Sequence, residues 1–485
     1  MQTPFGEIPD RHLAQMSMAE AHDYLRARRV TRRDVLRATA LGAAAVVAGP
    51  LLSRRAGLAA TPPAAPHVQF GADPRGAMAV SWHTVEPVTN PRLELIGLGG
   101  DPVAAETRSV AGHPTVYHHV GLSGLEPDTA YAYRLTHDGA SSEPEGTFRT
   151  APSLPGPFTF TAFGDQGVST NGAATTARVR AIEPAFHFHT GDLCYAYQTG
   201  TGDVTKPAPI VPQLQSRIVN QAVWDNWLKQ VTPVAAGTPW MPTVGNHEME
   251  YGYGPLGYDA YLARFALPGD GTAGTPTVYA VRYGNVALVA LDGNDVSVEI
   301  SANRGYTGGA QATWIDATLG ALRADPSIDF IVVGYHNCNY CTNVVHASDD
   351  GVRGWEPLFD RHQVDLVING HNHCYERSHP IRARSVTRDV GSGSTIAPAT
   401  DGTTYITAGG GGQAAYQAAL YPASYVTVWP GVRVPESGEF SAFRYLDISF
   451  IACDVAPRTP DSPATLTVRA LRPDGTEIER VTLAR

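Results

Sequence analysis

The sequence predicts a small all-β sandwich followed by a larger α/β domain. Its 485 residues exceed what one ordinary core holds, so two or more domains are expected. Residues 67–152 contain short strand-like runs separated at regular intervals by turn residues, which is typical of a sandwich. From residue 156 to 485, compact apolar runs alternate with helical stretches, which indicates buried strands covered by helices.

The first 60 residues resemble an export signal and leader. Arg32 and Arg33 precede an Ala-rich apolar stretch at 38–52, and small residues follow at 56–60. The stretch is short for a membrane span, and its paired arginines resemble a twin-arginine signal. An uncleaved membrane anchor is the alternative. We therefore expect a secreted protein, extracellular or in the periplasm or cell envelope, that meets the membrane only during export.

The first domain is expected to follow a Pro-rich linker, TPPAAP at 61–66. Its strand-like runs are 77–85, 91–98, 115–122, 129–137 and 145–150. The segment GLEPDTAYAYRL resembles the fibronectin type III pattern, because a Tyr follows closely on a turn. His118 and His119 alternate along one of the strands, so we expect them to be structural.

The second domain is expected to contain buried strands and two prominent helices. Its strand-like runs are 158–163, 185–190, 286–292, 328–335, 364–369 and 403–408. Helices are expected within 216–231 and 309–324, and strands after about residue 440 should complete a sheet.

Polar side chains of metal-binding types follow most of these apolar runs. In chain order they are Asp165, Asp192, Tyr195, Asn246, His247, Glu248, His336, His371 and His373. Ligands of α/β sheets collect outside the carboxyl ends of strands, and a Gly before each motif lets the backbone turn towards that crevice. The alternative is a series of plain turns, but five such motifs in one chain favour a metal site.

The donor types constrain the metal ions. Three His, two Asp, one Asn and one Tyr exceed what one ion takes, so two ions bridged by a carboxylate are expected. A phenolate favours Fe(III), which readily deprotonates Tyr, whereas the Asn oxygen suits a divalent ion (Zn, Mn or Fe). Two adjacent ions fit the hydrolysis of a phosphate ester.

The motifs GDQG, GDLCY, GNHE, VGYH and GHNHCYER, in this order, resemble the purple acid phosphatases of the calcineurin-like metallophosphoesterase superfamily. The resemblance covers nearly the whole chain after the leader, since such enzymes often carry a fibronectin-like domain first. It implies a metallophosphoesterase fold, in which a sandwich of mixed β-sheets is flanked by helices.

The resemblance also implies a role for each residue. The Fe(III) ligands would be Asp165, Tyr195 and His373; the divalent-ion ligands would be Asn246, His336 and His371; and Asp192 would bridge the two ions. His247 resembles the histidine that orients the substrate. His346 matches a second such histidine only by its spacing, ten residues after His336.

The implied activity is that of an exported acid phosphatase acting on small phosphate monoesters. A metal-bound hydroxide would attack phosphorus, while His247 and His346 stabilise the phosphoryl oxygens and protonate the leaving group. A phosphodiesterase or nucleotide pyrophosphatase on the same core is the alternative; a non-enzymatic surface binding protein is disfavoured, because every ligand position is filled. The formal charge of -10 argues against a nucleic-acid partner. The natural substrate and the oligomeric state stay open.

The remaining motifs receive structural interpretations. An odd number of cysteines leaves at least one unpaired within the chain; a local disulfide is expected between Cys338 and Cys341, whereas Cys194 and Cys374 could be bonded or free thiols. His187 and His189 are expected in the core, and Glu248 should orient His247 or a water. GGGG at 409–412 is interpreted as a flexible turn.

Overall fold

A computed structural model describes residues 2–3, 6–7, 61–97, 100–141, 146–196, 219–269, 271, 275–416, 418 and 423–485. Except for the short paired strands β1 (Gln2–Thr3) and β2 (Gly6–Glu7), the predicted export signal lies outside these ranges. No helix in the described part of the chain is long and apolar enough to cross a membrane.

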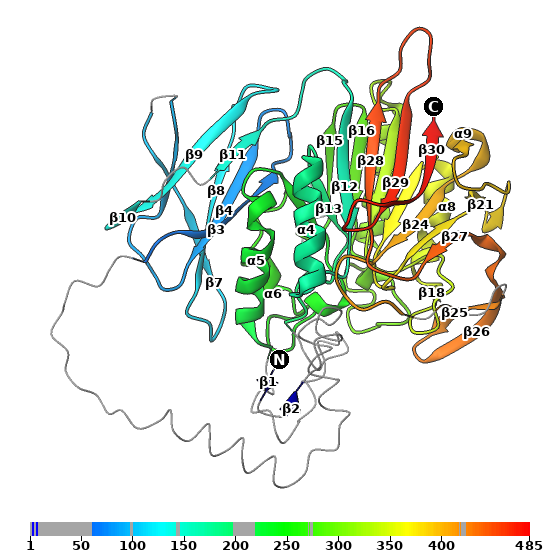
Figure 1. Cartoon of the computed structure of the whole chain (residues 1–485), viewed down its shortest axis with the longest axis horizontal. Helices are drawn as coiled ribbons and strands as arrows, with labels where there is room; N and C mark the ends of the chain where they lie inside the picture. Colours follow the sequence, from blue (N-terminus) through cyan, green and yellow to red (C-terminus); the bar gives the residue numbers. More distant parts are fainter. Residues whose placement is uncertain are drawn as a thin grey trace.

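The N-terminal domain is a sandwich of a four-stranded and a five-stranded sheet (Figure 1). The first has the order β3-β4-β8-β7 and the second β10-β9-β5-β6, with β11 also pairing with β9. The strands are β3 (Ala64–Phe70), β4 (Met78–Thr84), β5 (Arg92–Leu95), β6 (Val103–Ala104), β7 (Glu106–Ser109), β8 (Val116–Leu122), β9 (Ala130–His137), β10 (Ala140–Ser141) and β11 (Gly146–Arg149). β3 therefore begins within the segment expected to be a linker.

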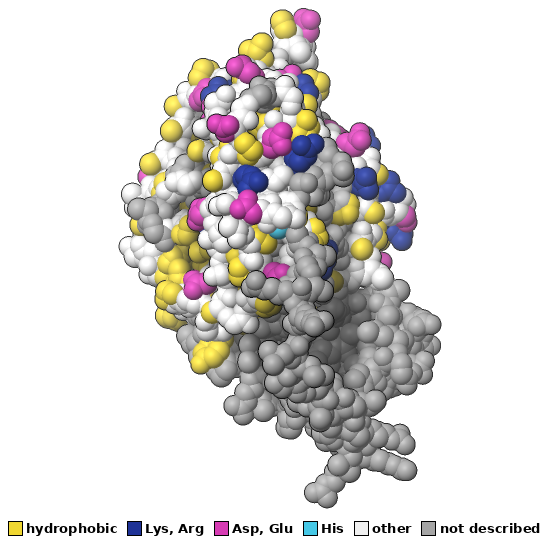
Figure 2. Space-filling model, turned by 90° about the vertical axis from the view of Figure 1, so that its left-hand side faces the viewer, with side chains coloured by type: hydrophobic (Ala, Val, Ile, Leu, Met, Phe, Trp, Pro, Cys, Tyr) yellow, Lys and Arg dark blue, Asp and Glu magenta, His cyan; other side chains and the backbone are white. Residues whose placement is uncertain are grey.

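Alternating side chains of these strands form the core of the sandwich. On β9, Tyr131, Tyr133 and Leu135 point inwards and pack with Trp82 and Phe148, as period-2 alternation requires. On the outer face, acidic and basic side chains lie interspersed (Figure 2). The predicted all-β sandwich is thus confirmed.

The C-terminal domain is a second, larger sandwich of two seven-stranded sheets. One sheet has the order β14-β13-β12-β28-β29-β30-β23, and the other β15-β16-β17-β19-β24-β20-β27. Their strands are β12 (Phe158–Phe163), β13 (His187–His189), β14 (Trp240–Pro242), β15 (Tyr279–Tyr283), β16 (Val286–Ala290), β17 (Phe330–Gly334), β19 (Leu366–Asn369), β20 (Tyr375–Ser378), β23 (Thr395–Ile396), β24 (Thr404–Ala408), β27 (Ser441–Tyr445), β28 (Phe450–Ala456), β29 (Thr465–Leu471) and β30 (Glu477–Ala484). The predicted strands after residue 440 complete both sheets rather than one, since β27 and β28 join different sheets.

Helices cover the outer faces of the two sheets. On the first sheet, Trp224 and Trp227 of α5 pack against Phe163 and Trp240; on the second, Ile315 of α7 lies in one cluster with strand residues. The helices are α4 (Thr170–Ile182), α5 (Gln221–Ala235), α6 (Asp259–Leu262), α7 (Ala310–Ala324), α8 (Glu356–Arg361) and α9 (Pro398–Asp401), and the 3-10 helices are η2 (Asn246–Glu248), η3 (Gly293–Asp295), η4 (Val352–Trp355) and η5 (Gly438–Phe440). A smaller sheet contains β18 (Ser348–Asp349), β25 (Ala423–Trp429) and β26 (Val432–Ser437), and β21 (Ile381–Arg382) pairs with β22 (Ser385–Val386). The predicted layered fold of mixed sheets flanked by helices is therefore confirmed.

Parallel strands set the position of the candidate site. β12, β13 and β14 run parallel in one sheet, and β16, β17, β19 and β24 run parallel in the other. Parallel strands end at the same edge of a sheet, so the residues that follow them meet there. The polar motifs identified in the sequence follow β12, β13, β14, β17 and β19.

A partly buried carboxylate joins the two domains. Asp225 of α5 accepts hydrogen bonds from His113 (2.8 Å), Thr115 (2.9 Å) and Tyr117 (2.7 Å) of the sandwich. The Arg264 guanidinium lies 3.9 Å away and 4.5 Å from the centre of the Tyr117 ring. This network fixes the sandwich against α5, the helix that also packs on the first sheet of the C-terminal domain.

We predict that Asp225→Asn destabilises the protein by roughly 1–3 kcal/mol at neutral pH, because one carboxylate serves three donors. Burial alone would raise the pKa of Asp225, but hydrogen bonds from His113 and Tyr117 outweigh it and lower the pKa to about 2. The stabilisation is therefore complete above about pH 4 and is lost as the pH falls through about 2. Urea unfolding of Asp225→Asn, with the exposed Asp461→Asn as control, should show a difference that narrows below pH 4. Equal stability of the two variants at pH 7 would contradict the prediction.

Candidate metal centre

The side chains predicted as metal ligands converge at the carboxyl ends of the two sheets. All of them are buried, with 0–6% of their surface exposed: Asp165, Asp192, Tyr195, Asn246, His336, His371 and His373. Buried polar groups are almost always hydrogen-bonded or bound to a metal ion. The lone pairs of these seven side chains therefore need hydrogen-bond donors or cations.

One half of the cluster surrounds His336. Its Nε2 atom lies 3.1 Å from Asn246 Oδ1, 3.2 Å from Asp192 Oδ2 and 3.2 Å from His371 Nδ1. Asp192, His336 and His371 form one of the groups whose ligand atoms lie close enough together to hold one ion.

The other half surrounds the phenol of Tyr195. Its hydroxyl lies 3.2 Å from Asp165 Oδ1 and 3.1 Å from His373 Nε2, and these two atoms are 3.5 Å apart. Asp165 Oδ1 is also 4.0 Å from His336 Nε2, so the two halves adjoin.

Backbone carbonyls determine which ring nitrogen of each histidine carries a lone pair. His336 Nδ1 donates to Thr190 O (2.8 Å) and His373 Nδ1 donates to Ala414 O (2.9 Å), because a carbonyl can only accept. In the neutral rings, both Nε2 atoms then carry lone pairs. That of His336 faces Asn246 Oδ1 and Asp192 Oδ2, and that of His373 faces the Tyr195 hydroxyl and Asp165 Oδ1. Lone pairs in mutual contact repel unless a cation lies among them, so the donor set fits bound metal ions.

The electrostatics of the cluster favour a positive charge. Burial opposes the protonation of His336, but the nearby Asp192 and Asp165 carboxylates outweigh it and raise its pKa to about 10. Without a metal ion, His336 therefore binds a proton at Nε2, the atom that faces the Asn246 and Asp192 oxygens. A divalent or trivalent ion would compensate the same carboxylates and lone pairs with a stronger Coulombic interaction than a proton.

Local backbone geometry directs four of these side chains into the crevice. Asp165, Asp192, Tyr195 and His371 have positive φ angles of 59°, 53°, 58° and 68°. The left-handed region costs a residue with a Cβ about 1–2 kcal/mol. Such conformations cluster at functional sites, where the surrounding fold imposes them.

Glycines let the backbone segments of the site approach each other. A Cβ at Gly245 would lie 2.2 Å from Asp192 Oδ1, and one at Gly370 would lie 2.7 Å from Asp165 Oδ2. The GGGG segment was predicted to be a flexible turn, and this prediction is wrong. It is buried: a Cβ at Gly409 would meet Asn372 O at 2.2 Å, and Gly411 N donates to Gly164 O. The segment packs against the Asp165 loop.

Glu248 stabilises the backbone of the site rather than orienting His247. Its carboxylate accepts the N–H groups of Asp192 (2.8 Å), Leu193 (2.8 Å) and Gly245 (2.7 Å). It therefore fixes the loop on which Asp192 adopts its left-handed conformation.

The two predicted substrate-binding histidines lie on the outer side of the buried cluster. His247 is 21% exposed; its Nε2 is 4.0 Å from Asp192 Oδ2 and its ring centre 4.4 Å from that of Tyr195. Burial lowers the pKa of His247. His346 is 24% exposed, with its ring centre 4.1 Å from that of His371. One histidine thus borders each half of the cluster.

Two side chains outside the sequence motifs contact histidines of the site. Glu299 lies 3.1 Å from His346 Nδ1 and 3.4 Å from His371 Nε2, and Tyr416 stacks on His373 with ring centres 3.9 Å apart. Neither belongs to a motif at a strand end, and Glu299 lies in a loop after η3 without a recognisable pattern. Only its proximity in the fold reveals it.

The expected disulfide between Cys338 and Cys341 is absent, because all five cysteines are free thiols. Cys338, Cys341 and Cys374 form a small buried cluster beside the predicted metal ligands, whereas Cys194 packs with the apolar residues around α5. Cys194 and Cys374 therefore belong to different clusters and form no bond with each other.

His187 and His189 lie in the core, as expected. Both are fully buried on β13, and their ring centres lie 4.0 Å and 6.3 Å from the centre of Trp240. Burial lowers the pKa of both imidazoles, so they are neutral.

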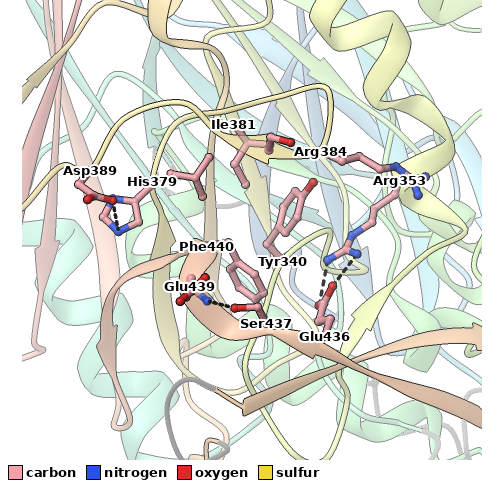
Figure 3. A pocket seen from close by; sticks show the side chains of 12 residues that line it. Tyr340, Arg353, His379, Ile381, Arg384, Asp389, Glu436, Ser437, Glu439 and Phe440 are labelled. Carbon is pink, nitrogen blue, oxygen red and sulfur yellow. Dashed lines mark hydrogen bonds and ion pairs between the residues drawn. The ribbon is translucent and has the colours of Figure 1, made fainter.

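A cavity of about 610 Å³ lies apart from this cluster (Figure 3). It is lined by Tyr340, Arg353, Ile381 and Phe440, among others, and by none of the predicted metal ligands. The Arg353 guanidinium is already bonded to both oxygens of Glu436, so its charge is compensated within the protein.

Comparisons with known proteins agree with this architecture. Residues 63–150 match the family described as Purple acid Phosphatase, N-terminal domain, and residues 159–375 match Calcineurin-like phosphoesterase. An uncharacterized protein of Mycobacterium tuberculosis is 36% identical over 86% of this chain and 85% of its own length. A phosphoenolpyruvate phosphatase of Allium cepa is 28% identical over 71% and 69%. A purple acid phosphatase from yellow lupin seeds has the same fold, with a TM-score of 0.68, 19% identity and coverage of 88% of this chain and 75% of its own.

The chain therefore belongs to the calcineurin-like phosphoesterases, a class of metallophosphoesterases. Membership in this class implies a site for two metal ions, and the buried Asp192, His336 and His371 cluster fits one of them. Within that class it is related to the purple acid phosphatases, whose N-terminal domain it shares.

We predict that Gly245→Ala disrupts the metal centre, because its Cβ would lie 2.2 Å from Asp192 Oδ1 and 2.6 Å from Asp192 N. Relief of that clash must move the carboxylate, with a cost of roughly 1–3 kcal/mol. Thermal unfolding and metal content measure the effect. Gly354→Ala is the control, since its Cβ meets nothing within 4 Å. Wild-type metal content in Gly245→Ala would contradict the prediction.

Proposed function

We propose that the protein is an acid phosphatase that hydrolyses small phosphate monoesters at an Fe(III)–divalent metal pair. The observation that carries the proposal is that two groups of buried ligand-type side chains adjoin each other, around His336 and around Tyr195. The partly exposed His247 and His346 border them. Asp192 belongs to one group, and its Oδ1 accepts the backbone N–H of His247. Its Oδ2 lies 3.2 Å from His336 Nε2, and we assign Asp192 the bridging role from the resemblance of its motif.

The metals and the protein have separate tasks in this proposal. When bound, two adjacent ions polarise the phosphate oxygens and lower the pKa of the attacking water. Asp165, Tyr195 and His373 would hold the ferric ion, and Asn246, His336 and His371 the divalent ion. The Thr190 and Ala414 carbonyls orient the imidazoles of His336 and His373 so that no rearrangement is needed when the ions bind.

His247 and His346 would bind the substrate. Both border the ligand cluster and are partly exposed, so their rings can meet phosphoryl oxygens that approach from solvent. N–H donors stabilise the charge that develops on those oxygens, and one imidazole can deliver a proton to the leaving oxygen.

The proposed ferric ion rests on Tyr195. Its hydroxyl contacts the Asp165 carboxylate and the His373 imidazole. A strong Lewis acid at this position would make the phenol a phenolate ligand, and that interaction produces visible absorption.

We predict that the metal-loaded protein hydrolyses p-nitrophenyl phosphate with higher kcat/KM than bis-p-nitrophenyl phosphate, because two histidine donors fit a dianionic monoester. Asp192→Asn should reduce kcat by at least roughly 100-fold, since the bridging charge is lost. Asp461→Asn is the matched control on the surface. A preference for the diester would replace this proposal by a phosphodiesterase, and unchanged activity of Asp192→Asn would contradict the assignment of the site.

A second prediction concerns colour. Purified protein containing iron should show a visible absorption band that Tyr195→Phe abolishes, because the band requires a phenolate–Fe(III) bond. Tyr283→Phe, at the end of β15 where its ring contacts Phe158 at the start of β12, should leave the band intact. A colourless wild-type protein that contains two zinc ions would refute the ferric assignment.

A further inference from the structure

Glu299 connects one predicted metal ligand to one predicted substrate-binding residue. Its Oε2 lies 3.4 Å from His371 Nε2, and its Oε1 lies 3.1 Å from His346 Nδ1. The side chain is only 11% exposed. Both carboxylate oxygens therefore act as acceptors, each for a different histidine.

These contacts decide the tautomer of both rings. His371 Nε2 donates to Glu299, which leaves Nδ1 as the lone-pair atom that faces His336 Nε2 at 3.2 Å. His346 Nδ1 donates to the same carboxylate, so Nε2 is the remaining nitrogen and donates to a substrate oxygen when the ring carries both protons. A single side chain thus presents the metal-facing atom of one histidine and the substrate-facing atom of the other.

Arg433 of β26 extends this arrangement to the backbone before His346. Its Nη2 lies 3.0 Å from Glu299 Oε1 and also donates to Val345 O, while its Nη1 donates to Val344 O at 2.9 Å. The guanidinium therefore joins Glu299 to the two carbonyls that immediately precede His346. A planar, forked donor is suited to such a bridge, whereas a lysine offers a single point charge.

The loop that carries Glu299 is anchored independently of its side chain. The buried carboxylate of Asp349 accepts the backbone N–H groups of Val298 (3.1 Å) and Glu299 (3.3 Å) and the Ser297 hydroxyl (2.6 Å). The position of the Glu299 backbone is thus set by Asp349, and its carboxylate acts from a fixed base.

We propose that Glu299 is a positioning residue which, held by Arg433, orients His371 towards the divalent ion and His346 towards the substrate. The inference rests on the proposed function for the role of His346, but its effect on metal binding through His371 does not require any particular reaction. Glutamine cannot replace Glu299, because it offers one acceptor oxygen where two histidines each need one, and its amide N–H would face a donor.

The decisive experiment compares Glu299→Gln with Glu439→Gln, an exposed glutamate on η5. Zn²⁺ affinity, measured by competition with a chelator, should fall roughly 10–100-fold in Glu299→Gln, as expected when the partner of a metal-binding histidine is lost. With p-nitrophenyl phosphate, kcat/KM should fall by a similar factor, and inhibition by inorganic phosphate should weaken. Zn²⁺ affinity and kcat/KM equal to those of Glu439→Gln would overturn the proposal.

Arg433→Gln provides an independent test if Glu299→Gln fails to fold. It should reduce kcat/KM roughly tenfold, equivalent to about 1.4 kcal/mol, while Zn²⁺ affinity changes less, because the guanidinium contacts the His346 side of the carboxylate. The double variant should lose less than the product of the two single effects; full additivity would remove Arg433 from the proposal. Tight Zn²⁺ binding by a wild-type protein that hydrolyses neither test ester would refute the proposed function alone.

Discussion

The arrangement of the C-terminal domain depends on one electrostatic constraint: buried oxygen and nitrogen lone pairs must face each other at 3.1–3.2 Å around His336. Such contacts repel unless a cation compensates them, and the pKa of about 10 for His336 reflects the same demand. Neighbouring groups are organised to hold the lone pairs in place. The Thr190 carbonyl fixes the His336 ring, and Glu248 fixes the Asp192 loop.

The two sheets hold these buried polar side chains close together. Parallel strands of both sheets end at one edge, so short loops bring the ligands together without long flexible connections. Positive φ angles at four of the predicted ligands cost about 1–2 kcal/mol each. Such conformations persist where the surrounding packed structure imposes them. The same rigidity extends to the N-terminal sandwich, which Asp225 ties to α5.

Much of this organisation could be predicted from the order of residue types. Apolar runs followed by Gly and then Asp, Asn or His indicate strands that end at a ligand crevice, and the structure brings those side chains together. Other features could not be predicted. The GGGG segment is typical of a flexible turn, but Gly409 is required because Asn372 O and Asp165 Oδ2 approach it closely. Cys338 and Cys341 have disulfide spacing, yet they remain thiols in a cluster with Cys374.

The sequence by itself determined the layered fold, the donor types and the strand ends that carry them, because periodicity and Gly–polar motifs are local properties. Only the tertiary structure decided which ring nitrogen of each histidine faces the site and which acid controls it. Those choices depend on hydrogen bonds between distant parts of the chain: Asp165 accepts the backbone N–H of a residue 206 positions away, and Glu299 meets His371 across 72. No local pattern encodes such pairs, since they arise only when the two sheets pack.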